Sequence, residues 1–171
     1  LYDKDYGVDY FATKLYTSFE DEEFTREIQA LRHLGNTSLA IDLGCATGTK
    51  TLQLAEGFKR VIGYDISPDM IEQAKLKSKK YPNAEFKIGD FEKGIPEADE
   101  SASFVFMNLG TAGDAMDIKR VLTSIKRVLN RNGKFLLSFY NAHAIYNNCW
   151  FLPWPLALAA KINAESHCLD V

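Results

Sequence analysis

The chain has 171 residues and a formal net charge of −3, from 20 Lys and Arg against 23 Asp and Glu. With 46% hydrophobic and 25% charged residues, it has the composition of one soluble globular domain, which excludes the disordered and fibrous classes. The slightly negative charge gives no general attraction to nucleic acid or to an anionic membrane. Its three cysteines are widely spaced and match neither a disulfide framework nor a metal motif, so we expect a cytoplasmic protein.

Helical periodicity marks the start of the chain. Phe24, Ile28 and Leu31 follow one another at intervals of four and three residues, ahead of Gly35 and Asn36. This spacing places the three side chains on one face of a helix that stops at the glycine. We assign residues 1–36 to an N-terminal helical cap.

Short apolar segments then alternate with helical ones. The pattern predicts strands over residues 39–43, 60–64, 84–88, 103–107 and 134–140. Two of the intervening helices have clear N-terminal signals, which are Ser67 followed by Pro68, and Asp117. Strands that alternate with helices predict an α/β fold, with a doubly wound, mostly parallel sheet and helices on both faces.

Polar residues follow three of these strands, where a sheet of this kind binds its ligands. Asp42 to Gly48 reads Asp-Leu-Gly-Cys-Ala-Thr-Gly, and its glycines let the backbone turn sharply and approach a ligand closely. Asp65 ends the next strand, 21 residues after Gly44, where an acidic side chain can accept hydrogen bonds from a ribose diol. Gly89 and Asp90 end the third strand. The spacing therefore predicts a ligand that contains adenosine.

The glycine spacing does not favour a nicotinamide dinucleotide. The dinucleotide loop G-x-G-x-x-G, begun at Gly44, requires glycine at the third and sixth positions, where this chain has Ala46 and Thr49. A dehydrogenase is thus disfavoured.

From residue 39 to residue 140 the chain resembles the class I, Rossmann-like S-adenosylmethionine-dependent methyltransferases. Their first motif, [D/E]-x-G-x-[G/A]-x-G, matches residues 42–48 at every position. Three further segments match in order, namely 61–65 with Ser67 and Met70, 89–91, and 125–134. The resemblance implies a methyltransferase that transfers a methyl group by direct displacement, and residues 37–141 as its cofactor-binding core.

The resemblance also implies the site residues. The loop would approach the methionine part of S-adenosylmethionine, or of its product S-adenosylhomocysteine, with the carboxylate of Asp42 holding the loop or the amino group. Asp65 would hold the ribose, Ile66 or Met70 would pack on the adenine, Asp90 beside Phe91 would accept from the adenine amino group, and the carbonyl of Asn108 would accept from the ammonium. The full predicted set is Asp42, Gly44, Cys45, Ala46, Gly48, Asp65, Ile66, Met70, Asp90, Phe91 and Asn108.

The methyl acceptor is expected to be a small molecule. The segment that follows the fourth strand, Asn108-Leu-Gly, lacks the N-P-P-[YF] motif that stacks a flipped base, and the chain has no Pro-Cys pair for attack on a pyrimidine. An RNA or protein acceptor, and a non-catalytic domain that only binds S-adenosylmethionine, remain the alternatives. His143 is a weak candidate for a general base, and the three histidines have no metal-ligand spacing.

Residues 142–171 are rich in aromatic side chains. In the family the sheet continues past its fifth strand, so the chain is expected to be truncated there. The segment would then form a lid or begin the missing half of the sheet. An open sheet edge would also permit pairing with a second copy of the chain.

Overall fold

The computed structural model of the chain describes residues 14–33, 35–108 and 111–138. Five parallel strands form one sheet in the order β3-β2-β1-β4-β5. Their bounds are β1 Leu39–Leu43, β2 Arg60–Asp65, β3 Ala84–Ile88, β4 Ala102–Met107 and β5 Leu129–Leu137. The predicted parallel sheet is confirmed, and the strand order reverses beside β1, which is where such sheets bind ligands.

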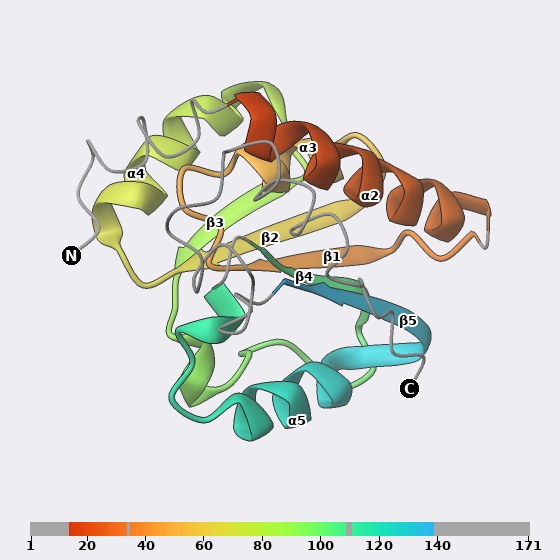
Figure 1. Ribbon diagram of the computed structural model, residues 1–171, viewed down its shortest axis with the longest axis vertical. Helices are drawn as coiled ribbons and strands as arrows, with labels where there is room; N and C mark the ends of the chain where they lie inside the picture. Colours follow the sequence, from red (N-terminus) through yellow and green to blue (C-terminus); the bar gives the residue numbers. More distant parts are fainter. Residues whose placement is uncertain (1–13, 34, 109–110, 139–171) are drawn as a thin grey trace, which may run out of the picture.

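Helices cover both faces of this sheet, as predicted (Figure 1). The helices α2 (Lys14–His33), α3 (Thr49–Ala55) and α4 (Pro68–Lys77) lie on one face, and α5 (Ile118–Val128) lies on the other. Short 3₁₀ helices follow α4, β3 and β4, and they are η1 (Ser78–Lys80), η2 (Phe91–Lys93) and η3 (Thr111–Gly113). Within the described ranges, none of the helices has the length and apolar character needed to cross a membrane.

Two helices begin at the capping residues that the sequence indicates. Ser67 Oγ accepts a hydrogen bond from the backbone N–H of Met70 at 3.4 Å, and Pro68 occupies the first turn of α4. Asp117 Oδ1 accepts from the N–H of Arg120 at 3.0 Å at the start of α5. These side chains satisfy backbone donors that a helix leaves unpaired at its N-terminus.

β1 lies at the centre of the core, and all five of its residues are buried. Leu39, Ile41 and Leu43 pack in one cluster with residues of α5, whereas Ala40 packs on the opposite face with residues of α2 and α3. Burying a side chain such as leucine or isoleucine contributes about 1.5–3 kcal/mol. This double burial fixes β1, and with it the loop that leaves its carboxyl end.

The last strand begins earlier than the sequence predicts. The apolar periodicity from Ile118 to Leu129 predicts a final helix that ends at Asn132 and Gly133. In the structure α5 ends at Val128, and Leu129 already pairs with Ala102 of β4. The register then shifts, and Lys134 pairs with Phe104. Gly133 allows this irregularity because a Cβ there would lie 2.9 Å from Leu129 Cδ2 and 3.0 Å from the carbonyl oxygen of Ala102. The predicted end of the strand, residues 139–140, lies outside the described residues.

Candidate cofactor site

The loop after β1 is attached to the end of β2 by its backbone. The N–H groups of Gly44 and Cys45 both donate to the carbonyl oxygen of Tyr64, at 2.8 and 2.9 Å. The loop has a left-handed backbone at Gly44 (φ +75°), Ala46 (φ +45°) and Gly48 (φ +80°). Glycine adopts this conformation freely, whereas an alanine is strained there by roughly 1 kcal/mol or more. The loop is therefore held in a defined shape at the carboxyl edge of the sheet.

Asp65 completes this attachment. Its Oδ2 accepts from the backbone N–H of Ala46 at 2.8 Å, and its Oδ1 accepts from the N–H of Ser67 at 2.9 Å. A carboxylate has about four lone-pair positions, so these two bonds leave room for further donors. The side chain thus combines two features: it fixes the loop, and it retains the acceptor capacity that a ribose diol requires.

Asp42 lies beneath the loop, in the interior. Its side chain is only 2% exposed, and the hydroxyl of Thr51 on α3 donates to its Oδ2 at 2.6 Å. Burial is the main cause that raises the pKa of Asp42, and the charge of Asp65 adds to it, while the bond from Thr51 and the charge of Lys50 oppose the increase. Together these effects raise the pKa from 3.8 to about 7. Asp42 therefore joins β1 to α3, two residues before the loop begins at Gly44.

Gly48 and Cys45 are both close-packed. A Cβ at Gly48 would lie 2.6 Å from Phe86 Cζ and 3.0 Å from Ala74 Cβ, so the backbone needs a glycine there. Cys45 is buried, and burial together with the neighbouring charges of Asp42 and Asp65 raises the pKa of its thiol. A protonated, buried thiol is a poor nucleophile. Cys45 therefore has a packing role in the loop.

The predicted adenine side of the site has an accessible apolar residue. Ile66, just after β2, is 64% exposed, whereas Met70, a residue of α4, is 2% exposed. Of the two candidates for packing on adenine, Ile66 is the accessible one in this structure. Ile88, at the end of β3, is 60% exposed as well. Sequence analysis did not select Ile88, although its place at the end of a strand was a usable signal.

Asp90 and Phe91 both follow β3, as predicted, with Asp90 capping η2 and Phe91 as the first residue of that helix. Asp90 Oδ1 accepts from the N–H of Glu92 at 3.0 Å, and its Oδ2 lies 3.3 Å from the exposed ammonium of Lys93. Both residues line a small cavity, together with Leu43, Tyr64, Gly89, Gly94, Ile95 and Pro96. Asp90 therefore has local backbone and surface partners and still borders this cavity.

Thr111, which the sequence analysis did not select, lies against two of the predicted site residues. Its N–H and its hydroxyl donate to the carbonyl oxygen of Asn108, at 3.2 and 2.7 Å. Its Cγ2 lies so near the loop that a Cβ on Gly44 would come within 2.5 Å of it. The Asn108 carbonyl that was predicted to accept from an ammonium thus already has two donors. A third donor would require the Thr111 hydroxyl to rotate away.

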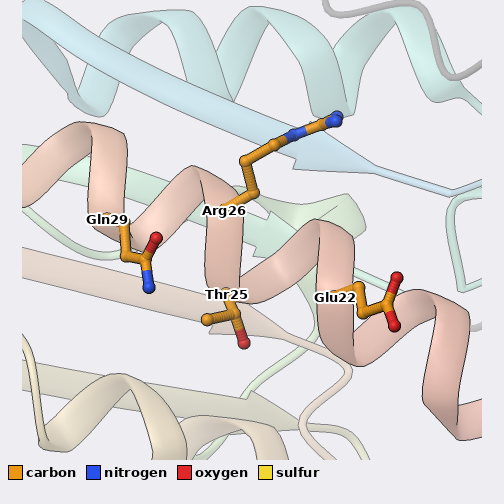
Figure 2. A pocket seen from close by; sticks show the side chains of 4 residues that line it. All are labelled: Glu22, Thr25, Arg26 and Gln29. Carbon is orange, nitrogen blue, oxygen red and sulfur yellow. The ribbon is translucent and has the colours of Figure 1, made fainter.

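A second hollow, on α2, contains none of the predicted site residues. Glu22, Thr25, Arg26 and Gln29 of α2 line it, and Figure 2 shows the side chain of Arg26 on one side of the helix, with Thr25 and Gln29 on the other. A hollow lined by four polar residues of one helix lacks the enclosed, apolar lining that small-molecule sites have. The candidate base His143 and the predicted segment 142–171 lie outside the described residues.

Comparison with known families decides between a dinucleotide-binding dehydrogenase and a methyltransferase. Residues 36–167 match the family model described as a methyltransferase domain. The chain belongs to this methyltransferase family. One curated relative, trans-aconitate 2-methyltransferase of Methylobacterium radiotolerans, is 42% identical over 88 residues, which cover 48% of this chain and 32% of that protein. The chain spans half or less of the length of each of the first four curated relatives that it matches.

Solved structures support the same fold. A protein from Pyrococcus horikoshii superposes with a TM-score of 0.67 and 23% identity, over 90% of this chain and 73% of that one. A phosphoethanolamine N-methyltransferase from Haemonchus contortus, solved with phosphoethanolamine and S-adenosylhomocysteine, superposes with a TM-score of 0.55 and 23% identity, over 60% of this chain and 22% of that one. At this identity the likeness extends to the fold. It confirms the Rossmann-like methyltransferase architecture predicted from the sequence.

Proposed function

We propose that the chain binds S-adenosylmethionine at the carboxyl edge of β1, β2 and β3 and transfers its methyl group to a small molecule. The observation that carries this proposal is the carboxylate of Asp65, which fixes the loop through Ala46 and keeps lone pairs for a ribose diol. The exposed Ile66 follows directly in the chain and offers an apolar surface to an adenine ring. Membership of the methyltransferase family is the independent support.

The residues at this edge fit the parts of such a cofactor. Asp65 would accept from the ribose hydroxyls, Asp90 from the adenine amino group, and the loop would lie against the methionine part. Asp42, which is buried below that loop, would favour its positive charge. The cofactor would supply a methyl group on a positively charged sulfur, so that an acceptor lone pair displaces it and the C–S electrons return to sulfur.

For this chemistry the protein has mainly to position the reactants and exclude water. The rigid strand ends and the hydrogen-bonded loop are suited to holding one reactant, and we assign no catalytic residue among the described ones. We keep His143 as a candidate base, and we keep residues 1–36 and 142–171 as the segments that flank the cofactor-binding core.

A small-molecule acceptor is supported by two observations. The relative from Methylobacterium radiotolerans is named for trans-aconitate, which is a small carboxylic acid. The chain itself has a net charge of −3, which does not attract a polyanionic acceptor such as RNA. The name of the relative makes small organic acids the first acceptors to test.

Calorimetry with the whole chain tests which cofactor the protein binds. We expect S-adenosylmethionine and S-adenosylhomocysteine to bind and NAD to bind far more weakly. Tight binding of NAD, with no binding of the other two, would overturn the proposal. Release of S-adenosylhomocysteine is then followed with trans-aconitate and related acids as acceptors. Binding without turnover on any acceptor, RNA included, would favour the non-catalytic alternative.

A further inference from the structure

We propose that Asp42 and Thr51 couple cofactor binding to the release of one proton, so that the chain binds S-adenosylmethionine more tightly as the pH rises through neutrality. The inference rests on the proposed function, because it concerns the same site. It assigns Thr51 as a positioning residue, a role that the sequence motifs do not contain.

The geometry places a carboxyl group in the interior with a neutral partner. The Asp42 side chain is 2% exposed and Thr51 is fully buried, and the two meet at 2.6 Å between β1 and α3. A hydroxyl donor stabilises a buried carboxylate much less than a cation does. The uncharged form of Asp42 is therefore favoured while the site contains no positive ligand.

The neighbouring groups strengthen this preference. Asp65 of β2 approaches from across the loop and carries a like charge, and the Cys45 thiol adds no positive charge. From α3, Lys50 opposes the effect. Lys77 of α4 donates instead to Thr47, at 2.8 Å. Among the described residues, the strand neighbours of Asp42 are Gly63 of β2 and Phe106 of β4, and neither ionises. Phe24 of α2 lies in the same apolar cluster as Phe106.

These causes together raise the pKa of Asp42 to about 7. A positively charged ligand near this carboxyl favours its ionised form, so binding and proton loss are linked. S-adenosylmethionine carries one positive charge more than S-adenosylhomocysteine, because its sulfur is a sulfonium. The linkage should therefore be stronger for the substrate than for the product, which would lower product inhibition at higher pH.

The test is calorimetry of the whole chain with S-adenosylmethionine at pH 6, 7 and 8, in pairs of buffers with different ionisation enthalpies. We expect release of about half a proton per bound ligand at pH 7, and roughly tenfold tighter binding at pH 8 than at pH 6. S-adenosylhomocysteine should show a smaller change. Histidines titrate in the same range, so variants are needed to assign the proton.

Asp42→Asn should bind with no proton release and with little dependence on pH. Thr51→Val, which removes the hydroxyl, should move the transition to higher pH, whereas Thr51→Ser should restore it. Thr49→Val is the matched control, because Thr49 is an exposed threonine of the same helix, and it should behave as wild type. NMR titration of the ligand-free chain, with labelled aspartate, should show one carboxyl that changes near pH 7 and is lost in Asp42→Asn.

Equal affinity at pH 6 and pH 8 with no proton release would overturn this inference while leaving the proposed cofactor intact. If affinity and proton release depend on pH identically in wild type and Thr51→Val, Thr51 does not position Asp42. Preference for NAD would instead overturn the proposed function, so the two failures are distinguishable.

Discussion

The carboxylate of Asp65 at the end of β2 accepts a hydrogen bond from the backbone N–H of Ala46, 19 residues earlier in the chain, at 2.8 Å. Ala46 has a left-handed backbone, with φ +45°. The hydrogen bond that the N–H of Ala46 donates to Asp65 offsets part of the strain of this conformation. A side chain predicted to contact the ligand thus also shapes the loop beside it.

This double role makes Asp65→Ala a severe change for cofactor affinity. We expect a loss of about 2–4 kcal/mol in binding free energy, because hydrogen bonds to a charged group contribute about 1.5–3 kcal/mol each and water replaces part of the loss. Isothermal titration with S-adenosylhomocysteine measures it. Asp69→Ala removes a nearby exposed carboxylate from the first turn of α4 and is the control. Unchanged affinity in Asp65→Ala would refute the assignment.

Gly48→Ala should destabilise the fold through a steric clash. The added methyl would lie 2.6 Å from Phe86 Cζ, in a residue with φ +80°. Backbone strain of roughly 1 kcal/mol and overpacking of roughly 1–3 kcal/mol should together lower the free energy of unfolding by about 2–4 kcal/mol. Urea denaturation gives the value.

Gly35→Ala is the matched control for this substitution. Its φ of +66° imposes a similar strain, but nothing lies within 4 Å of the added methyl. It should cost only about 1 kcal/mol. Equal losses for the two variants would show that the contact with Phe86 has no energetic weight.

Local signals in the sequence were sufficient for the first four strands and for the starts of α4 and α5. Ser67 and Asp117 each accept a hydrogen bond from a backbone N–H three residues later, so a short stretch of chain contains both partners. The end of α5 depended instead on a distant residue. Leu129 fits the helical pattern, but its pairing with Ala102 of β4 outweighs that pattern and starts β5 there.

The same distinction applies to the candidate site. The glycine spacing and the acids at the strand ends could be predicted directly, because these residues stand at or next to the ends of strands that are themselves visible in the sequence. The bond from Thr51 to Asp42 and the contact of Thr111 with Gly44 join separate elements. Neither residue belongs to a motif, and only the packing of α3 and η3 against the sheet brings them to the site.

Ser103→Ala should weaken the start of β1. Ser103 is fully buried, and its Oγ accepts from the backbone N–H of Ser38 at 3.0 Å and lies 2.6 Å from Ser38 Oγ. Its removal leaves a partly buried donor without its partner, so we expect a loss of about 1–3 kcal/mol in unfolding free energy. Ser101→Ala is the control, because Ser101 bonds to Ala98 at an exposed site. If both variants lose the same stability, the buried bond has no special weight.

The stability of the ligand-free chain should depend on pH through Asp42. Its carboxyl has a pKa of about 7 in the folded state and 3.8 as the ordinary value. The folded state therefore holds a proton that the unfolded state has already lost between about pH 4 and pH 7. The contribution of this group to stability is complete below pH 4 and disappears as the pH rises through 7.

Comparison with Asp42→Asn isolates this contribution, because asparagine cannot titrate. Wild type should lose about 2–3 kcal/mol relative to the variant between pH 5 and pH 8. Urea denaturation of both proteins across this range measures the difference, and Asp69→Asn, at an exposed position, should follow wild type. Parallel curves for wild type and Asp42→Asn would mean that Asp42 is ionised throughout. Its carboxylate would then be stabilised by more than the Thr51 hydroxyl, and the proton-linked binding proposed above would fail with it.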